Sequence, residues 1–284
     1  MKEVLITADS TCDLPKDIIE KYNIVITPLS ILLGDDTFTD GVDIFPSGIY
    51  DYVAKTGALP KTAAVPPSYY YQLFEEASAS GKAVVHIGLS SAISSSYQNA
   101  CIAASDFDDI YCVDSKSLCT AMGLLVLKAC DFREKGFDAK KIAHRVESLV
   151  PKVSTTFVLD NLEYLHKGGR CSGVAKFSAN VLGIKPMIGV NPNEGSLDVV
   201  KKYRGRIEAV YKQYINDSLK DIDKIDKSRI VVANSGSINP EIIQYALGVI
   251  NGKADFDEVI TADAGCTISS HCGPKTLAIF YIKK

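Results

Sequence analysis

The first half of the chain alternates short apolar runs with helical patterns, and this alternation constrains the fold more than any other feature. Pro28 interrupts one of the runs, which predicts an edge or bent strand there. Strands that alternate with helices predict a parallel sheet with helices on both faces. The expected strands are Val4–Ala8, Ile24–Leu33, Ala83–Leu89 and Ile110–Val113. The expected helices are Lys16–Tyr22, Ser47–Thr56, Ser68–Ser80, Ser96–Ala104, Ser117–Lys135 and Ala139–Leu149.

The second half has a different pattern and predicts a mixed sheet. Val150-Pro151-Lys152 breaks the preceding helical run, and a Gly-rich stretch extends from Gly168 to Gly195. We therefore expect an α/β protein with an N-terminal parallel-sheet α/β/α domain, residues 1–153, and a C-terminal mixed-sheet α/β domain, residues 154–284. The 284 residues are enough for two domains. The expected elements are strands Thr155–Leu159, Met187–Val190, Ser196–Tyr203, Arg229–Ala233, Glu258–Ala262 and Leu277–Ile282, a hairpin turn at Pro192–Gly195, and helices Gly205–Asp221 and Pro240–Ile250.

Composition excludes several classes of protein. A net charge of −3 gives no sign of the concentrated basic face that binds nucleic acid. The first apolar run ends at Asp9, too early for a signal peptide, and no apolar stretch has membrane-spanning length. We expect a cytoplasmic protein without membrane insertion. The eight cysteines form no C-x-x-C pair, so we expect reduced thiols, no metal and no cofactor.

Two hydroxyl-rich segments follow predicted strands. Ser90–Gln98 holds five serines where a helix begins, and free N–H groups at a helix start favour a carboxylate or phosphate. Capping alone needs fewer serines, so we favour a ligand contact. A nucleophilic serine is the other alternative, although the segment lacks the G-x-S-x-G pattern. For Asp9–Pro15 we favour a simple role, in which Ser10, Thr11 or Asp13 caps the next helix.

Two further segments carry cationic or titratable side chains. Paired glycines in Lys167–Arg170 permit a tight turn that presents Arg170, either to an anion or to a surface salt bridge. His271 precedes a Gly-Pro turn, and we expect it on a loop, where it could bind an anion or transfer a proton. Lys61–Ser68 reads as an extended loop that enters a helix, and alone it indicates no function.

Together, and in this order, these segments resemble the DegV family. Each motif is weak by itself, whereas the ordered set is specific and spans essentially the whole chain. The matching segments are Asp9–Leu14, Pro28-Leu29, Asp40–Asp43, Thr62–Pro66, Ser90–Tyr97, Leu162–Arg170 and His271–Lys275.

The resemblance implies a lipid carrier rather than an enzyme. In that family a long-chain fatty acid lies in a tunnel between two domains, and its carboxylate is held by hydroxyls that correspond here to Thr62 and Ser94. We add the neighbouring Ser95. Arg170 and His271 match residues near the head group and the surface where a partner docks. The partner is a separate ATP-dependent fatty-acid kinase, which makes an acyl phosphate for phospholipid synthesis. The carrier is expected to be a monomer.

The chain departs from the family pattern at four positions. Ala63 and Ala64 replace Ser and Gln, Ser95 replaces Gly, and Lys275 replaces Gly. The alternative functions are an acyl hydrolase that uses Ser94 or the Cys272/His271 pair, and a regulatory or structural protein. The missing elbow motif and the absence of an obvious third triad member count against the hydrolase, whereas the regulatory or structural alternative stays open.

Overall fold

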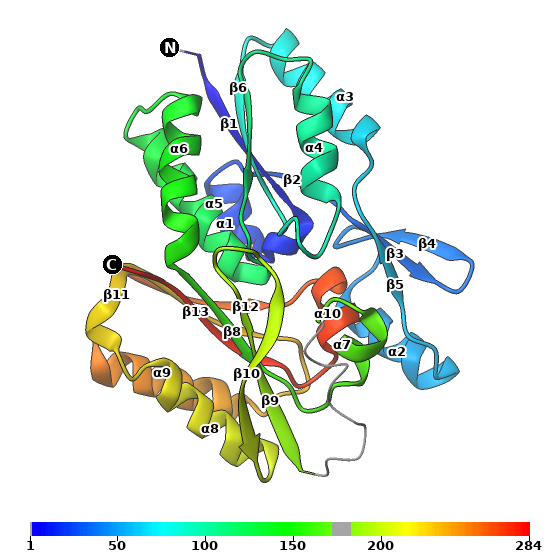
Figure 1. Ribbon diagram of the computed structural model, residues 1–284, viewed down its shortest axis with the longest axis vertical. Coiled ribbons are helices and arrows are strands. Elements are labelled where there is room, and N and C mark those ends of the chain that lie inside the picture. The colour runs from blue at the N-terminus through cyan, green and yellow to red at the C-terminus, as the bar shows by residue number, and fades with distance from the viewer. Residues whose placement is uncertain (1, 172–182) are drawn as a thin grey trace.

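The computed structural model describes residues 2–171 and 183–284 (Figure 1). Residues 172–182 of the predicted Gly-rich stretch lie outside the described residues. As expected, the chain is an α/β protein with a parallel four-stranded sheet and a mixed six-stranded sheet. The domains built on them are called here the parallel-sheet domain and the mixed-sheet domain. A boundary after residue 153 stays a prediction.

The parallel sheet has the strand order β2-β1-β6-β7. Every residue of β6 is buried, as expected for a strand covered on both faces. Figure 1 shows α3 and α4 on one side of the sheet and α5 and α6 on the other. The elements are β1 (Val4–Asp9), α1 (Lys16–Lys21), β2 (Val25–Thr27), α3 (Pro67–Ala79), β6 (Ala83–Gly88), α4 (Ser96–Ala104), β7 (Ile110–Asp114), α5 (Cys119–Glu134) and α6 (Ala139–Leu149).

The apolar run Ile24–Leu33 is not one strand, and that prediction is corrected. The run breaks at Pro28, which cannot donate a ladder hydrogen bond. Its first part is the edge strand β2, and its second part, β3 (Ser30–Leu33), leaves the parallel sheet. β3 lies instead in a small antiparallel sheet of order β4-β3-β5, with β4 (Asp36–Thr39) and β5 (Lys61–Ala63). The predicted loop 61–68 therefore begins as a strand, and α2 (Pro46–Thr56) lies between β4 and β5.

The mixed sheet has the strand order β10-β9-β8-β13-β11-β12, in which only β11 and β12 pair in parallel. The expected hairpin across Pro192–Gly195 is confirmed as β9 and β10. In Figure 1, α8 and α9 lie along one side of this sheet. The elements are β8 (Val153–Val158), α7 (Glu163–Gly168), β9 (Ile184–Val190), β10 (Leu197–Arg204), α8 (Ile207–Ser218), β11 (Ile225–Asn234), α9 (Pro240–Lys253), β12 (Glu258–Asp263), α10 (Cys266–Cys272) and β13 (Leu277–Lys283).

Helix α5 joins the two domains. It packs against β1 and β6 of the parallel sheet and against β8, β11 and β13 of the mixed sheet. Its residues from Cys119 to Leu127 are all buried, which explains why its sequence is apolar on every side. Arg229 of β11 donates to both carboxylate oxygens of Asp131 on α5, at 2.6 and 2.8 Å. None of the helices in the described ranges is long and apolar enough to cross a membrane.

Candidate functional site

A pocket lies between the two domains, with residues from both in its wall. The space inside it, counted together with the open solvent at its mouth, is about 940 Å³. Most of its wall is apolar and comes from strands and loops of both domains and from α10. The larger apolar side chains in it are Leu29, Leu89, Ile93, Leu118, Phe157, Leu165, Leu197, Ile268 and Phe280.

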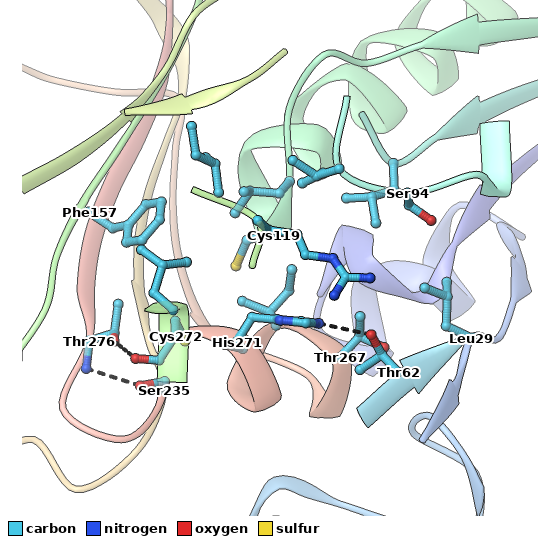
Figure 2. Close-up of a pocket in the computed structure, with 18 of the residues that line it drawn as sticks. Leu29, Thr62, Ser94, Cys119, Phe157, Ser235, Thr267, His271, Cys272 and Thr276 are labelled. Carbon is cyan, nitrogen blue, oxygen red and sulfur yellow. Dashed lines mark hydrogen bonds between the residues drawn. The ribbon is translucent and has the colours of Figure 1, made fainter. Parts of the chain in front are cut away.

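All five residues that the sequence singled out line this pocket. They are Thr62 on β5, Ser94 and Ser95 at the start of α4, Arg170 after α7, and His271 on α10. Figure 2 shows the His271 ring pointing toward Thr62. The pocket therefore combines a largely apolar wall with a group of hydroxyl, imidazole and guanidinium side chains. The role of each of them in ligand binding stays a prediction.

His271 is the most constrained of the five. Its Nε2 lies 2.8 Å from Thr62 Oγ1, and its Nδ1 is buried without a hydrogen-bond partner among the described residues. A Cβ on Gly168 would lie 2.5 Å from Nδ1, so only glycine lets α7 come this close to the ring. The prediction that His271 lies on a loop is wrong, because Cys266–Cys272 forms a helix that ends at Gly273.

His271 and Arg170 differ in their charge near pH 7. Burial, together with the charge of Arg170, lowers the pKa of His271 to about 4. The ring is therefore neutral near pH 7, where it can donate or accept a hydrogen bond but brings no charge. Arg170 is exposed and donates from Nη1 to the Gly168 carbonyl at 2.6 Å. The positive charge at this end of the pocket thus comes from Arg170.

The serines of the segment Ser90–Gln98 make different contacts. Ser94 Oγ accepts from the Ser96 N–H at 3.2 Å, so it satisfies a free donor at the start of α4 while it lines the pocket. Ser90 Oγ donates to the Gly195 carbonyl at 2.9 Å, and Ser91 Oγ to Asp114 at 2.6 Å. Ser94 therefore both caps the helix and lines the pocket, and the ligand contact favoured from the sequence stays a prediction.

The expected helix cap in Asp9–Pro15 is wrong. Helix α1 begins after Pro15, and no side chain in the described part of the chain caps it. The segment contributes a buried carboxylate instead, because Asp9 accepts from Tyr70 Oη at 2.5 Å and from the Leu89 N–H at 2.8 Å. Asp9 thus fixes the strand end from which the serine-rich segment begins.

The sequence missed pocket residues that carry no motif. Thr267, Ser235 and Thr276 line the pocket, and their hydroxyls all bond within the protein. Thr267 Oγ1 donates to Asp40 at 2.7 Å, Ser235 Oγ to the Gly273 carbonyl at 2.6 Å, and Thr276 Oγ1 to the Cys272 carbonyl at 3.1 Å. Single threonines and serines in apolar surroundings are common in any fold. The one available signal was that Thr267 and Thr276 flank the predicted His271 segment.

The hydrolase alternative requires a nucleophile hydrogen-bonded to a base, and the described residues hold no such pair around Ser94 or Cys272. Burial raises the pKa of the Cys272 thiol to about 12, so the thiolate is scarce near pH 7. Within the described ranges, no hydrogen bond joins His271 to Cys272 or to Ser94, whereas a nucleophile needs a base within reach. Those ranges also hold no cluster of three or more side chains suited to a metal ion.

Comparisons with known proteins place the chain in a family. The model of the DegV family, described as uncharacterised proteins, matches residues 3–284. A DegV domain-containing protein of Clostridium acetobutylicum is 31% identical over 288 residues, which cover 100% of both chains. A second, from Caldanaerobacter subterraneus, is 30% identical over 286 residues with the same coverage.

Solved structures have the same fold. The crystal structure of DegV, a fatty acid binding protein from Bacillus subtilis, is 26% identical with a TM-score of 0.87 and covers 100% of both chains. A stearic acid-binding protein from Eubacterium ventriosum is 25% identical with a TM-score of 0.84, over 100% of this chain and 99% of that one. A DegV family protein from Thermus thermophilus reaches a TM-score of 0.90 at 24% identity, over 99% of this chain and 100% of that one. The chain belongs to the DegV family.

Proposed function

We propose that this protein binds a long-chain fatty acid in the pocket between its two domains, with the carboxylate at Thr62, Ser94 and Ser95. The observation that carries the proposal is a largely apolar pocket that also holds hydroxyls, Arg170 and His271. The relatives from Bacillus subtilis and Eubacterium ventriosum, described as fatty acid-binding and stearic acid-binding, support it.

The chemistry of the pocket suits such a ligand. Burying about 14 methylenes at ~0.8 kcal/mol each contributes ~11 kcal/mol, and association costs of ~4–15 kcal/mol offset much of this. A buried carboxylate is tolerated only when donors meet it. The Thr62 and Ser94 hydroxyls can donate, and the exposed Arg170 supplies positive charge nearby.

We further propose that the protein is a non-catalytic, cytoplasmic and monomeric carrier. In this proposal it presents the carboxylate to a separate ATP-dependent fatty-acid kinase, and the acyl phosphate formed there feeds phospholipid synthesis. The family resemblance supports this role. The absence of a G-x-x-x-x-G-K-[ST] phosphate-binding motif from the sequence also favours phosphoryl chemistry on another protein.

Native mass spectrometry of the purified protein tests the proposal most directly. We expect a co-purified mass that corresponds to a fatty acid, and after delipidation we expect calorimetry to show binding of acids between C14 and C18. Failure to bind any of these acids would contradict the carrier function. Time-dependent ester hydrolysis that is lost in Ser94→Ala would support the hydrolase instead.

A further inference from the structure

Helix α10 is held at both ends by the small antiparallel sheet. Asp40 follows β4 directly and contacts the first residues of the helix, whereas Thr62 lies on β5 and contacts His271 near its end. Both strands pair with β3, so the two contacts come from one small sheet. The sheet is formed by residues before position 64, and the helix lies beyond position 265.

The Asp40 contact is buried and dense. Its Oδ1 accepts from the Cys266 N–H at 2.9 Å. Its Oδ2 accepts from Thr267 Oγ1 at 2.7 Å, from the Thr267 N–H at 3.3 Å and from Ser10 Oγ at 2.9 Å. Asp40 is only 3% exposed, and a carboxylate buried to this degree is stabilised by such donors.

Among the described residues, none next to α10 replaces this contact. The N-cap position is Gly265, which has no side chain to accept from the first N–H groups. A Cβ at Gly265 would lie 2.6 Å from Asp13 Oδ1 and 3.5 Å from Asp40 Oδ1. Glycine therefore leaves room for a carboxylate that comes from a distant part of the chain.

We propose that Asp40 is a positioning residue of the ligand site, which fixes the start of α10 so that His271 stays against Thr62. Without Asp40 the first N–H groups of α10 would lose their acceptor, and the helix start would then be held by its packing against α2 and the weak bond from the Cys266 thiol to the Ile44 carbonyl at 3.2 Å. The helix carries four residues of the pocket wall: Thr267, Ile268, His271 and Cys272. Where the inference concerns lipid affinity, it rests on the proposed function.

The test is the titration of the His271 ring in Asp40→Asn, followed by NMR of its Cε1 proton. Asparagine keeps the shape of the side chain, but one of its two terminal atoms cannot accept a hydrogen bond. If α10 shifts, the ring gains solvent and its pKa rises toward the ordinary value near 6.5. Removal of a negative charge by itself would lower the pKa of a histidine, so a rise reports movement of the helix. We also expect oleate affinity to fall roughly tenfold.

Asp43→Asn is the matched control, because Asp43 lies in the same turn, is exposed and accepts only from the Thr39 N–H among the described residues. It should leave both readouts unchanged. Wild-type titration and wild-type affinity in Asp40→Asn would overturn the inference, even if the variant unfolds at a lower temperature.

If Asp40→Asn does not fold, Thr267→Val decides by titration alone, since it removes the 2.7 Å bond to Asp40 and keeps the side-chain shape. An unchanged His271 titration in that variant would overturn the inference. The proposed function can fail separately: wild-type protein that binds no fatty acid would contradict it, while the titration still decides the role of Asp40.

Discussion

His271 Nε2 lies 2.8 Å from Thr62 Oγ1, although 209 positions separate the two residues in the chain. The hydrogen bond joins β5 to α10 across the pocket. The family resemblance implied separate roles, with Thr62 on the carboxylate and His271 toward a docking partner. Because the two side chains bond to each other, a ligand that engages Thr62 also changes the surroundings of His271.

Thr62→Val should weaken fatty-acid binding. Valine keeps the shape of threonine but removes the hydroxyl, and a hydrogen bond to a charged group contributes ~1.5–3 kcal/mol, so we expect a loss of roughly 10- to 150-fold in affinity. Calorimetry with oleate on delipidated protein measures it. Thr62→Ser keeps the hydroxyl and should retain affinity. Equal affinities for the valine variant and the wild type would remove Thr62 from the carboxylate site.

Ser94→Ala should weaken binding by a similar factor for the same reason. The matched control is Ser91→Ala, because the Ser91 hydroxyl bonds to Asp114 and does not line the pocket. The control should bind oleate like the wild type. Wild-type affinity in the double variant Thr62→Val/Ser94→Ala would place the carboxylate elsewhere in the pocket.

The ligand-free protein should lose stability between pH 6.5 and pH 4 through His271. The pKa of this ring is about 4 when folded and near 6.5 when unfolded, so between these values the unfolded chain binds more protons. Allowing for partial exposure, we expect a loss of ~1–2 kcal/mol at pH 4.5 relative to pH 7. Urea unfolding of the wild type and His271→Gln at both pH values measures it. The variant should lose less stability, and parallel losses would contradict the assignment.

Asp13→Asn should stabilise the protein at alkaline pH. Burial and the neighbouring Asp40 charge raise the pKa of Asp13 to about 8, so the folded state keeps a proton that the unfolded chain releases near pH 4. Wild-type stability therefore falls as the pH rises from 4 to 8. Asparagine carries no charge and tolerates the left-handed backbone at this position, φ 46°. We expect a gain of at least ~1 kcal/mol at pH 8, and a smaller gain at pH 5 in the same urea experiment.

The sequence predicted the parts of the fold that periodicity encodes. Strands β1, β6 and β7 of the parallel sheet and the long helices around them follow from apolar patterns, and so does the β9–β10 hairpin. The sequence could not show that Ile24–Leu33 divides between two sheets, because a proline marks a break without saying where the chain continues. Pairing partners are a property of the folded chain.

Helix α10, which carries His271, could not be predicted from the sequence either. Its residues are poor or average helix formers, and its start is capped by Asp40, 226 positions away from Cys266. No local pattern could place His271 on a helix. The five predicted site residues line one pocket, but they were found through the motifs of a family and not through periodicity.

Arg170→Ala should separate lipid binding from phosphoryl transfer. Affinity comes mainly from burial of the acyl chain, to which an exposed guanidinium contributes little, so we expect oleate affinity to stay within about threefold. Transfer of a phosphoryl group to a carboxylate brings two anions together, and positive charge near them acts mostly in the transition state. With the cognate kinase we therefore expect acyl-phosphate formation to fall at least roughly tenfold.

A control variant, Lys167→Ala, and the titration of His271 test whether Arg170 acts on phosphoryl transfer and not on lipid binding. Lys167→Ala removes a nearby exposed charge that pairs with Glu163 and does not line the pocket, and it should leave binding and turnover unchanged. Loss of the Arg170 charge should also raise the pKa of His271, because that charge helps to lower it. A rise in this pKa with reduced turnover and intact binding supports a role in transfer. Equal losses of binding and turnover would mean that Arg170 neutralises the bound carboxylate, and unchanged turnover would remove Arg170 from the reaction.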